Sequence, residues 1–138
     1  MRNVDMARDY AMRAEWCLDE AERAFAAGNY PITVRRAQEA LEMASKAVLR
    51  KLAVEYPHEH DVGDALDRVS TKLPEYVAGK LDQLRALLTE LARVRGPALY
   101  GYEQEAVTAS QAFNLDYATK ILNQVKLLVK SCVRFARE

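Results

Sequence analysis

Apolar and small residues recur every three or four positions along most of this chain, as in helices that bury one face. A first stripe of this kind ends at Gly28-Asn29, two residues that favour the left-handed conformations that close a helix. A second stripe follows Tyr30-Pro31, because proline fits the first turn of a helix, and it runs to about Tyr56, before Pro57. The pattern predicts two long helices, and so short a link between them requires them to lie antiparallel.

The pattern continues beyond residue 57 with a short helix and a third long helix. Asp61 and Asp64 are suited to be an N-cap and a first-turn acid, which predicts a short helix from Val62 to about Lys72. Pro74-Glu75 then opens a helix that we expect to continue until Arg95-Gly96-Pro97 breaks it. This third long helix has the strongest helical pattern of the chain.

The remaining sequence predicts a loop and a last helix. Residues 96–113 combine breakers with tyrosine and leucine, and they form the only stretch long enough to act as a functional loop. Asn114 is placed to cap the last helix. The apolar stripe of that helix is widened by three residues beyond what one core contact needs: Ile121, Leu128 and Phe135. We therefore expect the last helix to offer a second surface to a partner.

These elements predict an all-α fold, an up-and-down four-helix bundle with an extra short helix between the second and third long helices. The 138 residues fit a single domain spanning 1–138, and half of them are apolar, enough for one core. Glycine and proline number only 5 and 4, too few for the turns of a many-stranded β protein.

The formal charge is zero, since 20 lysines and arginines balance 20 acidic residues. This balance argues against a sequence-independent nucleic-acid binder and against an anionic-membrane binder, both of which need a basic excess. The charge is nevertheless uneven, because the second and last helices are basic. Packed side by side they would form a positive groove; otherwise their cations lie on ordinary solvated faces. These cations are Arg35, Arg36, Lys46, Arg50, Lys51, Lys120, Lys126, Lys130, Arg134 and Arg137.

The sequence shows neither a signal peptide nor an apolar run long enough to span a bilayer, so we expect a cytoplasmic protein. Cys17 and Cys132 are too few for a disulfide framework, and we interpret them as reduced residues on helix faces.

Few residues suggest catalysis or a cofactor. No GxGxxG, HExxH or CxxC motif occurs, and Gly79-Lys80 lacks the earlier glycine that a phosphate-binding P-loop needs. The segment 58–61 (His-Glu-His-Asp) could supply two metal ligands or a turn and a cap, but no further ligands are evident, and we expect no metal and no cofactor. Four aromatic residues could stack on a nucleotide base or serve as packing plugs: Trp16, Tyr30, Tyr100 and Tyr102.

The second helix has a more specific pattern. After Ala27-Gly28-Asn29-Tyr30, residues 37–49 read Ala-Gln-Glu-Ala-Leu-Glu-Met-Ala-Ser-Lys-Ala-Val-Leu. This stretch resembles the signature of the HEPN family (higher eukaryotes and prokaryotes nucleotide-binding domain): a G-x-Y turn, then a helix reading A-Q-x-A-x-E-x-x-x-K-A-x-L. His60-Asp61 resembles a short H-D element of the same family. In this chain Gln38, Glu42 and Lys46 step by four and form one polar line on the helix.

The resemblance implies a small helical protein that dimerises and pairs with a minimal nucleotidyltransferase, often as a toxin–antitoxin couple, with a nucleotide or RNA as further partner. On this interpretation the ligand- or partner-binding residues are Tyr30, Gln38, Glu42, Lys46, His60 and Asp61. A ribonuclease branch of the family uses an arginine followed after four to six residues by histidine. Here no histidine follows His60, so the sequence favours a non-catalytic protein.

The alternative is a metal-independent RNA-cleaving toxin that lacks the usual histidine. Arg93 or Arg95 near the end of the third helix would be the catalytic arginine, assisted by Tyr100 or Tyr102. A third interpretation is a pure assembly module whose polar line only faces solvent.

Overall fold

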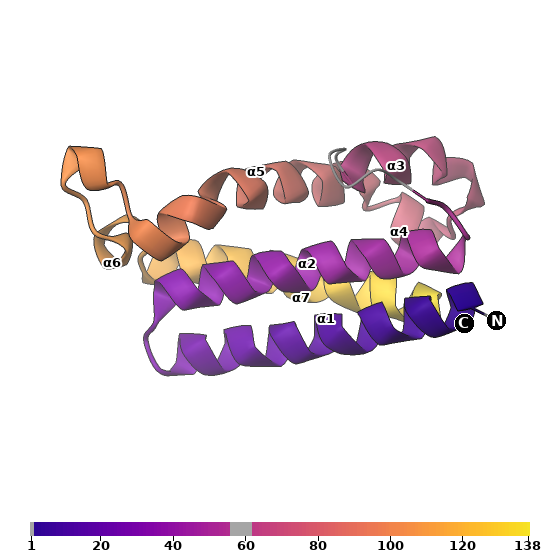
Figure 1. Cartoon of the computed structure of the whole chain (residues 1–138), viewed down its shortest axis with the longest axis horizontal. Helices are drawn as coiled ribbons and strands as arrows, with labels where there is room; N and C mark the ends of the chain where they lie inside the picture. Colours follow the sequence, from indigo (N-terminus) through magenta and orange to yellow (C-terminus); the bar gives the residue numbers. More distant parts are fainter. Residues whose placement is uncertain (1, 56–61) are drawn as a thin grey trace.

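The computed structural model describes residues 2–55 and 62–138, and nearly all of them lie in helices or turns (Figure 1). The predicted all-α class is confirmed, since no strand occurs in this part of the chain. The α-helices are α1 (Arg2–Ala26), α2 (Tyr30–Lys51), α3 (Val62–Arg68), α4 (Glu75–Ala78), α5 (Leu81–Tyr100), α6 (Ala109–Ala112) and α7 (Leu115–Arg137). Two 3₁₀ turns, Ser70–Lys72 and Glu103–Glu105, follow α3 and α5.

Helix α2 is the centre of the fold. It lies between α1 and α5 in Figure 1, with α7 behind it, and it packs against all three. Every residue of α2 is buried or half-buried. Consecutive long helices alternate in direction (Figure 1). The regular four-helix bundle itself stays a prediction, because the packing is centred on one helix.

Alanines form the contact between α1 and α2. Small side chains let the two helices approach closely, so that little space has to be filled between them. Eight alanines of these helices are fully buried: Ala7, Ala11, Ala14, Ala21, Ala37, Ala40, Ala44 and Ala47.

Asparagine caps fix the beginnings of α2 and α7, and the sequence predicted the one at Asn114. Asn29, with a φ of −92°, does not adopt the left-handed conformation expected of it but is the N-cap of α2. Gly28 adopts a φ of 77°, and the Asn29 side chain accepts a hydrogen bond of 3.3 Å from the backbone N–H of Ile32. Asn114 accepts one of 3.0 Å from the backbone N–H of Tyr117. Each cap satisfies a backbone donor that has no partner inside its helix.

The third long helix begins at Glu75 as predicted, but it is interrupted near its start and ends later than predicted. It is divided at Gly79 into α4 and α5, because a glycine inside a helix adds backbone freedom and no side-chain packing. Pro97 does not end α5, which continues to Tyr100. Proline removes one hydrogen bond from the last turn, but Ala98 is buried against the core and holds that turn in place.

The expected loop at 96–113 is consequently an ordered turn. Helix α5 ends at Gly101, with a φ of 72°, and Tyr102 and Val107 exchange backbone hydrogen bonds of 2.8 and 3.0 Å. Thr108 and Gln111 form a reciprocal capping box at the start of α6. The segment therefore holds its side chains in a defined geometry.

The packing of the last helix changes one interpretation of it. The residues that widen its stripe, Ile121, Leu128 and Phe135, are buried within this chain, so the width does not require a partner. Helices α2 and α7 do pack together, through their apolar faces, and the positive groove between them stays a prediction. Arg36 pairs with Glu39 at 2.7 Å, and Lys46 pairs with Glu42 at 3.2 Å.

Both cysteines are free thiols, as expected. Burial raises the pKa of Cys132 to about 12, so this thiol stays protonated at neutral pH. No helix among residues 2–55 and 62–138 is long and apolar enough to cross a membrane.

Helix α2 ends at Lys51 rather than near Tyr56, and the residue that turns the chain away is Ala53, with a φ of 57°. An alanine in this left-handed region costs ~1–2 kcal/mol that glycine does not. We expect Ala53→Gly to raise the free energy of unfolding by ~0.5–1 kcal/mol, after the greater freedom of glycine in the unfolded chain is subtracted. Urea unfolding followed by circular dichroism measures this free energy. Ala47→Gly, a control inside α2, should lower the free energy of unfolding by ~1 kcal/mol.

Candidate functional site

The polar line of α2 is a linked and largely buried set of side chains. The amide nitrogen of Gln38 donates to Glu42 at 2.8 Å, and the other carboxylate oxygen of Glu42 lies 3.2 Å from the Lys46 ammonium. Gln38 is only 6% exposed, and the side chains of Glu42 and Lys46 are 31% and 18% exposed. The line therefore does not simply face solvent.

One atom of this line has no partner. The amide oxygen of Gln38 is buried and accepts no hydrogen bond from the described residues. Leaving such an acceptor unsatisfied costs ~1–3 kcal/mol, so a donor from a bound molecule would be stabilised there.

The other residues that we grouped with this line are not brought to it. Tyr30 is the first residue of α2, eight residues before Gln38 and hence about 12 Å along the helix axis. Its ring packs on Phe25 of α1, with the ring centroids 5.8 Å apart. His60 and Asp61 lie outside the described residues.

Arg93 and Tyr102 meet at the end of the molecule where α5, α6 and α7 converge. They line a hollow of about 300 Å³, here called the Arg93 pocket. Its other lining residues are Glu90, Val94, Ala112, Phe113 and Tyr117. Helix α5 supplies the cation, the turn after Gly101 supplies the Tyr102 ring, and the first turn of α7 supplies Tyr117.

The other two residues predicted for RNA cleavage lie elsewhere. Arg95 is two residues after Arg93, which places it roughly 200° around the same helix. Its carbonyl accepts a hydrogen bond of 2.9 Å from Arg35 of α2. Tyr100 is 66% exposed and lines a neighbouring hollow with Leu99 and Val107. The structure therefore separates Arg93 from Arg95, and Tyr102 from Tyr100.

A hydrogen bond between Tyr117 and Glu90 forms one wall of the Arg93 pocket. The Tyr117 hydroxyl donates to Glu90 at 2.6 Å. Burial and this carboxylate raise the pKa of Tyr117 far above its ordinary value, so the phenol keeps its proton at neutral pH. Tyr117 can donate a hydrogen bond there but cannot act as a base.

The sequence had not pointed to Glu90, Phe113 or Tyr117. Glu90 precedes Arg93 by three residues and so lies on the same face of α5. This spacing could have identified Glu90 from the sequence as a neighbour of Arg93. Phe113 and Tyr117 flank the Asn114 cap at a spacing of four, and their rings pack with centroids 5.7 Å apart. Their approach to α5 follows from tertiary packing.

Comparison with known proteins identifies the family of this helical chain. The family model described as the HEPN domain matches residues 7–135. The chain belongs to the HEPN family. No curated protein and no solved structure matches it. The resemblance based on α2 is thus confirmed over nearly the whole chain.

HEPN membership suggests a nucleotide-binding or RNase-type function, and HEPN domains often dimerise. In this HEPN protein the Arg93 pocket has the groups that such ligands need: a guanidinium for phosphate, an exposed tyrosine ring for a base, and a carboxylate that can accept from a ribose hydroxyl. No cluster of three or more metal-binding side chains occurs among residues 2–55 and 62–138.

Proposed function

We propose that this HEPN protein acts by binding rather than by cleaving. It forms a homodimer, pairs with a minimal nucleotidyltransferase in a toxin–antitoxin couple, and holds a nucleotide in the Arg93 pocket. Residues 1–138 then form one cytoplasmic domain built as an up-and-down four-helix bundle.

The observation that supports nucleotide binding is the meeting of Arg93 and Tyr102 in one hollow. A phosphate binds a guanidinium through charge-assisted hydrogen bonds, and a base stacked on an aromatic ring gains about 1–3 kcal/mol. The hollow has about 300 Å³, at the lower end of small-molecule sites. The Tyr117–Glu90 hydrogen bond gives it a fixed wall.

The α2 residues support the partner half of the proposal. Glu42 and Lys46 are half-buried, so part of each side chain is accessible to a partner, and Gln38, whose oxygen is buried and unsatisfied, donates a hydrogen bond to Glu42. We assign them, with Tyr30, His60 and Asp61, to partner binding. A neighbouring reading frame with a G-S-x-D-x-D-like motif, and co-purification of its product, would support the nucleotidyltransferase as that partner.

Replacing Arg93 tests the nucleotide site. We expect Arg93→Ala to weaken binding of a nucleoside monophosphate about tenfold or more, because a hydrogen bond to a charged group is worth ~1.5–3 kcal/mol. Isothermal titration calorimetry on the full chain measures this. Arg95→Ala is the matched control, one cation removed from the same helix outside the pocket. Equal losses in both variants, or no saturable heat with the wild-type chain, would refute the site.

The same residues support one alternative, RNA cleavage assisted by Arg93 and Tyr102. Tyr102 is 41% exposed and could contact an RNA backbone beside Arg93. Incubation of the wild-type chain with single-stranded and structured RNA decides between the two functions. Cleavage that is abolished by Arg93→Ala, and kept by Arg95→Ala, would replace binding with catalysis as the function.

A further inference from the structure

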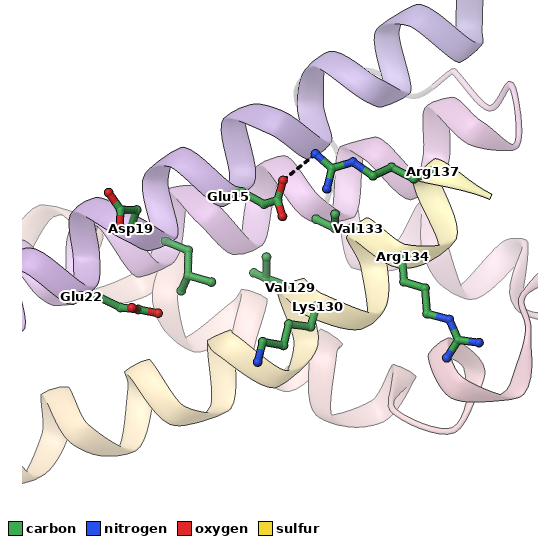
Figure 2. Close-up of a pocket in the computed structure, with 9 residues that line it drawn as sticks. Glu15, Asp19, Glu22, Val129, Lys130, Val133, Arg134 and Arg137 are labelled. Carbon is green, nitrogen blue, oxygen red and sulfur yellow. Dashed lines mark hydrogen bonds and ion pairs between the residues drawn. The ribbon is translucent and has the colours of Figure 1, made fainter.

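A groove between α1 and α7 separates acidic from basic side chains. Helix α1 contributes Glu15, Asp19 and Glu22 on one side, while α7 contributes Lys130 and Arg137 on the other (Figure 2). The groove has a volume of about 400 Å³, and its floor is apolar, made of Leu18, Val129 and Val133.

Two ion pairs already cross this groove and fix the order of its charges. Glu15 pairs with Arg137 at one end, and Glu22 lies 3.6 Å from Lys126 toward the other. Lys130, between them, forms no ion pair with the described residues, while Asp19 pairs with Arg23 of its own helix at 3.0 Å. Arg134 points away from α1 in Figure 2 and stacks on Tyr76, with its guanidinium 3.9 Å from the ring centroid. An acidic row on α1 thus runs beside a basic row on α7.

Exposed apolar side chains border both rows. Trp16, 70% exposed, lies beside Glu15 and Asp19 on α1, and Met12 precedes Trp16 by one helical turn. Leu127, 60% exposed, lies one turn before Lys130 on α7. Tryptophan is among the residues most often found as energetic centres of protein interfaces.

We propose that a second copy of this chain covers the α1–α7 face, with α1 of each copy lying over α7 of the other. The inference deepens the proposed function, on whose homodimer it rests, by assigning the interface. The charges of the two rows favour one orientation of the two copies. A two-fold axis parallel to the helices places the acidic row of one copy on the basic row of the other, whereas an axis across the helices in the same plane places acid on acid.

The same symmetry predicts which residues meet. Rotation about an axis parallel to the helices keeps each residue at its own level along them. Asp19 and Lys130 lie at similar levels in one groove, so Asp19 of each copy faces Lys130 of the other. Helices of 25 and 23 residues are each about 35 Å long, enough for an interface of standard size.

Charge reversal and rescue test this interface in the full chain. Sedimentation equilibrium should show a dimer at micromolar concentration. We expect Lys130→Glu to raise the dissociation constant about tenfold at low salt, and the double variant Asp19→Lys with Lys130→Glu to return it close to the wild-type value. Trp16→Ala should raise the dissociation constant about thirtyfold, and Leu99→Ala, an exposed apolar residue on α5, should leave it unchanged. All four side chains are exposed, so circular dichroism should show the same fold in every variant.

The tryptophan gives a second and independent readout, because Trp16 is the only one in the chain. Its fluorescence should shift to the blue, and its quenching by iodide should decrease, as the protein concentration rises through the dimerisation range. A dimer in which Trp16 stays exposed and Lys130→Glu has no effect would overturn this interface and leave the proposed homodimer standing. A chain that remains monomeric at ~100 µM would overturn both, while calorimetry of the Arg93 pocket would still decide nucleotide binding separately.

Discussion

Replacing Gly101 with alanine is expected to lower the free energy of unfolding by about 3 kcal/mol and to abolish nucleotide binding. Gly101 has a φ of 72°, which costs an alanine ~1–2 kcal/mol. A Cβ there would also lie 2.5 Å from the carbonyl oxygen of Val107 and 2.6 Å from the backbone nitrogen of Ala109. Both atoms belong to the backbone and cannot rotate away, so the turn after α5 has to move.

This movement would displace Tyr102, the residue that follows Gly101 and lines the Arg93 pocket. Thermal unfolding should show a melting temperature lowered by roughly 10 °C, and calorimetry should show no nucleotide binding. Gly28→Ala is the matched control, since Gly28 has a similar φ of 77° but no atom within 4 Å of an added Cβ. It should cost only ~1 kcal/mol and leave binding intact. Equal losses in the two variants would show that the close backbone approach at Gly101 is unimportant.

Replacing Leu41 with alanine is expected to cost about 3 kcal/mol of stability without any direct effect on the Arg93 pocket. Leu41 is fully buried in the middle of α2, the helix against which α1, α5 and α7 all pack. Removal of its side chain leaves a cavity, and buried leucine-to-alanine changes typically cost about 2–5 kcal/mol.

Urea unfolding followed by circular dichroism measures the loss at Leu41. Leu115→Ala at the start of α7 is the control, because this leucine is 49% exposed and its truncation should change stability by less than ~0.5 kcal/mol. A small loss at Leu41, similar to that at Leu115, would contradict the central role of α2.

The limits of sequence reasoning are clearest at α5. Its heptad-like stripe predicted a long helix, but Gly96-Pro97 predicted an end that the structure places four residues later, at Gly101. Local breakers act on one turn at a time, whereas the buried Ala98 stabilises that turn through contacts with distant residues. This wrong helix end affects the functional interpretation, because the sequence predicted a loop for residues that form an ordered turn beside Arg93.

The sequence by itself determined the helical class, the left-handed Gly28, the cap at Asn114, and the family, because each depends on local periodicity, local hydrogen bonds or a contiguous motif. Only the tertiary structure decided which of these residues meet. It placed Arg93 with Tyr102 and Tyr117, turned Arg95 away, and buried the wide stripe of α7 within the chain. It also set the acidic side of α1 along the basic side of α7. The physical reason is that such contacts join residues far apart in the chain, and their geometry follows from how whole helices pack around α2.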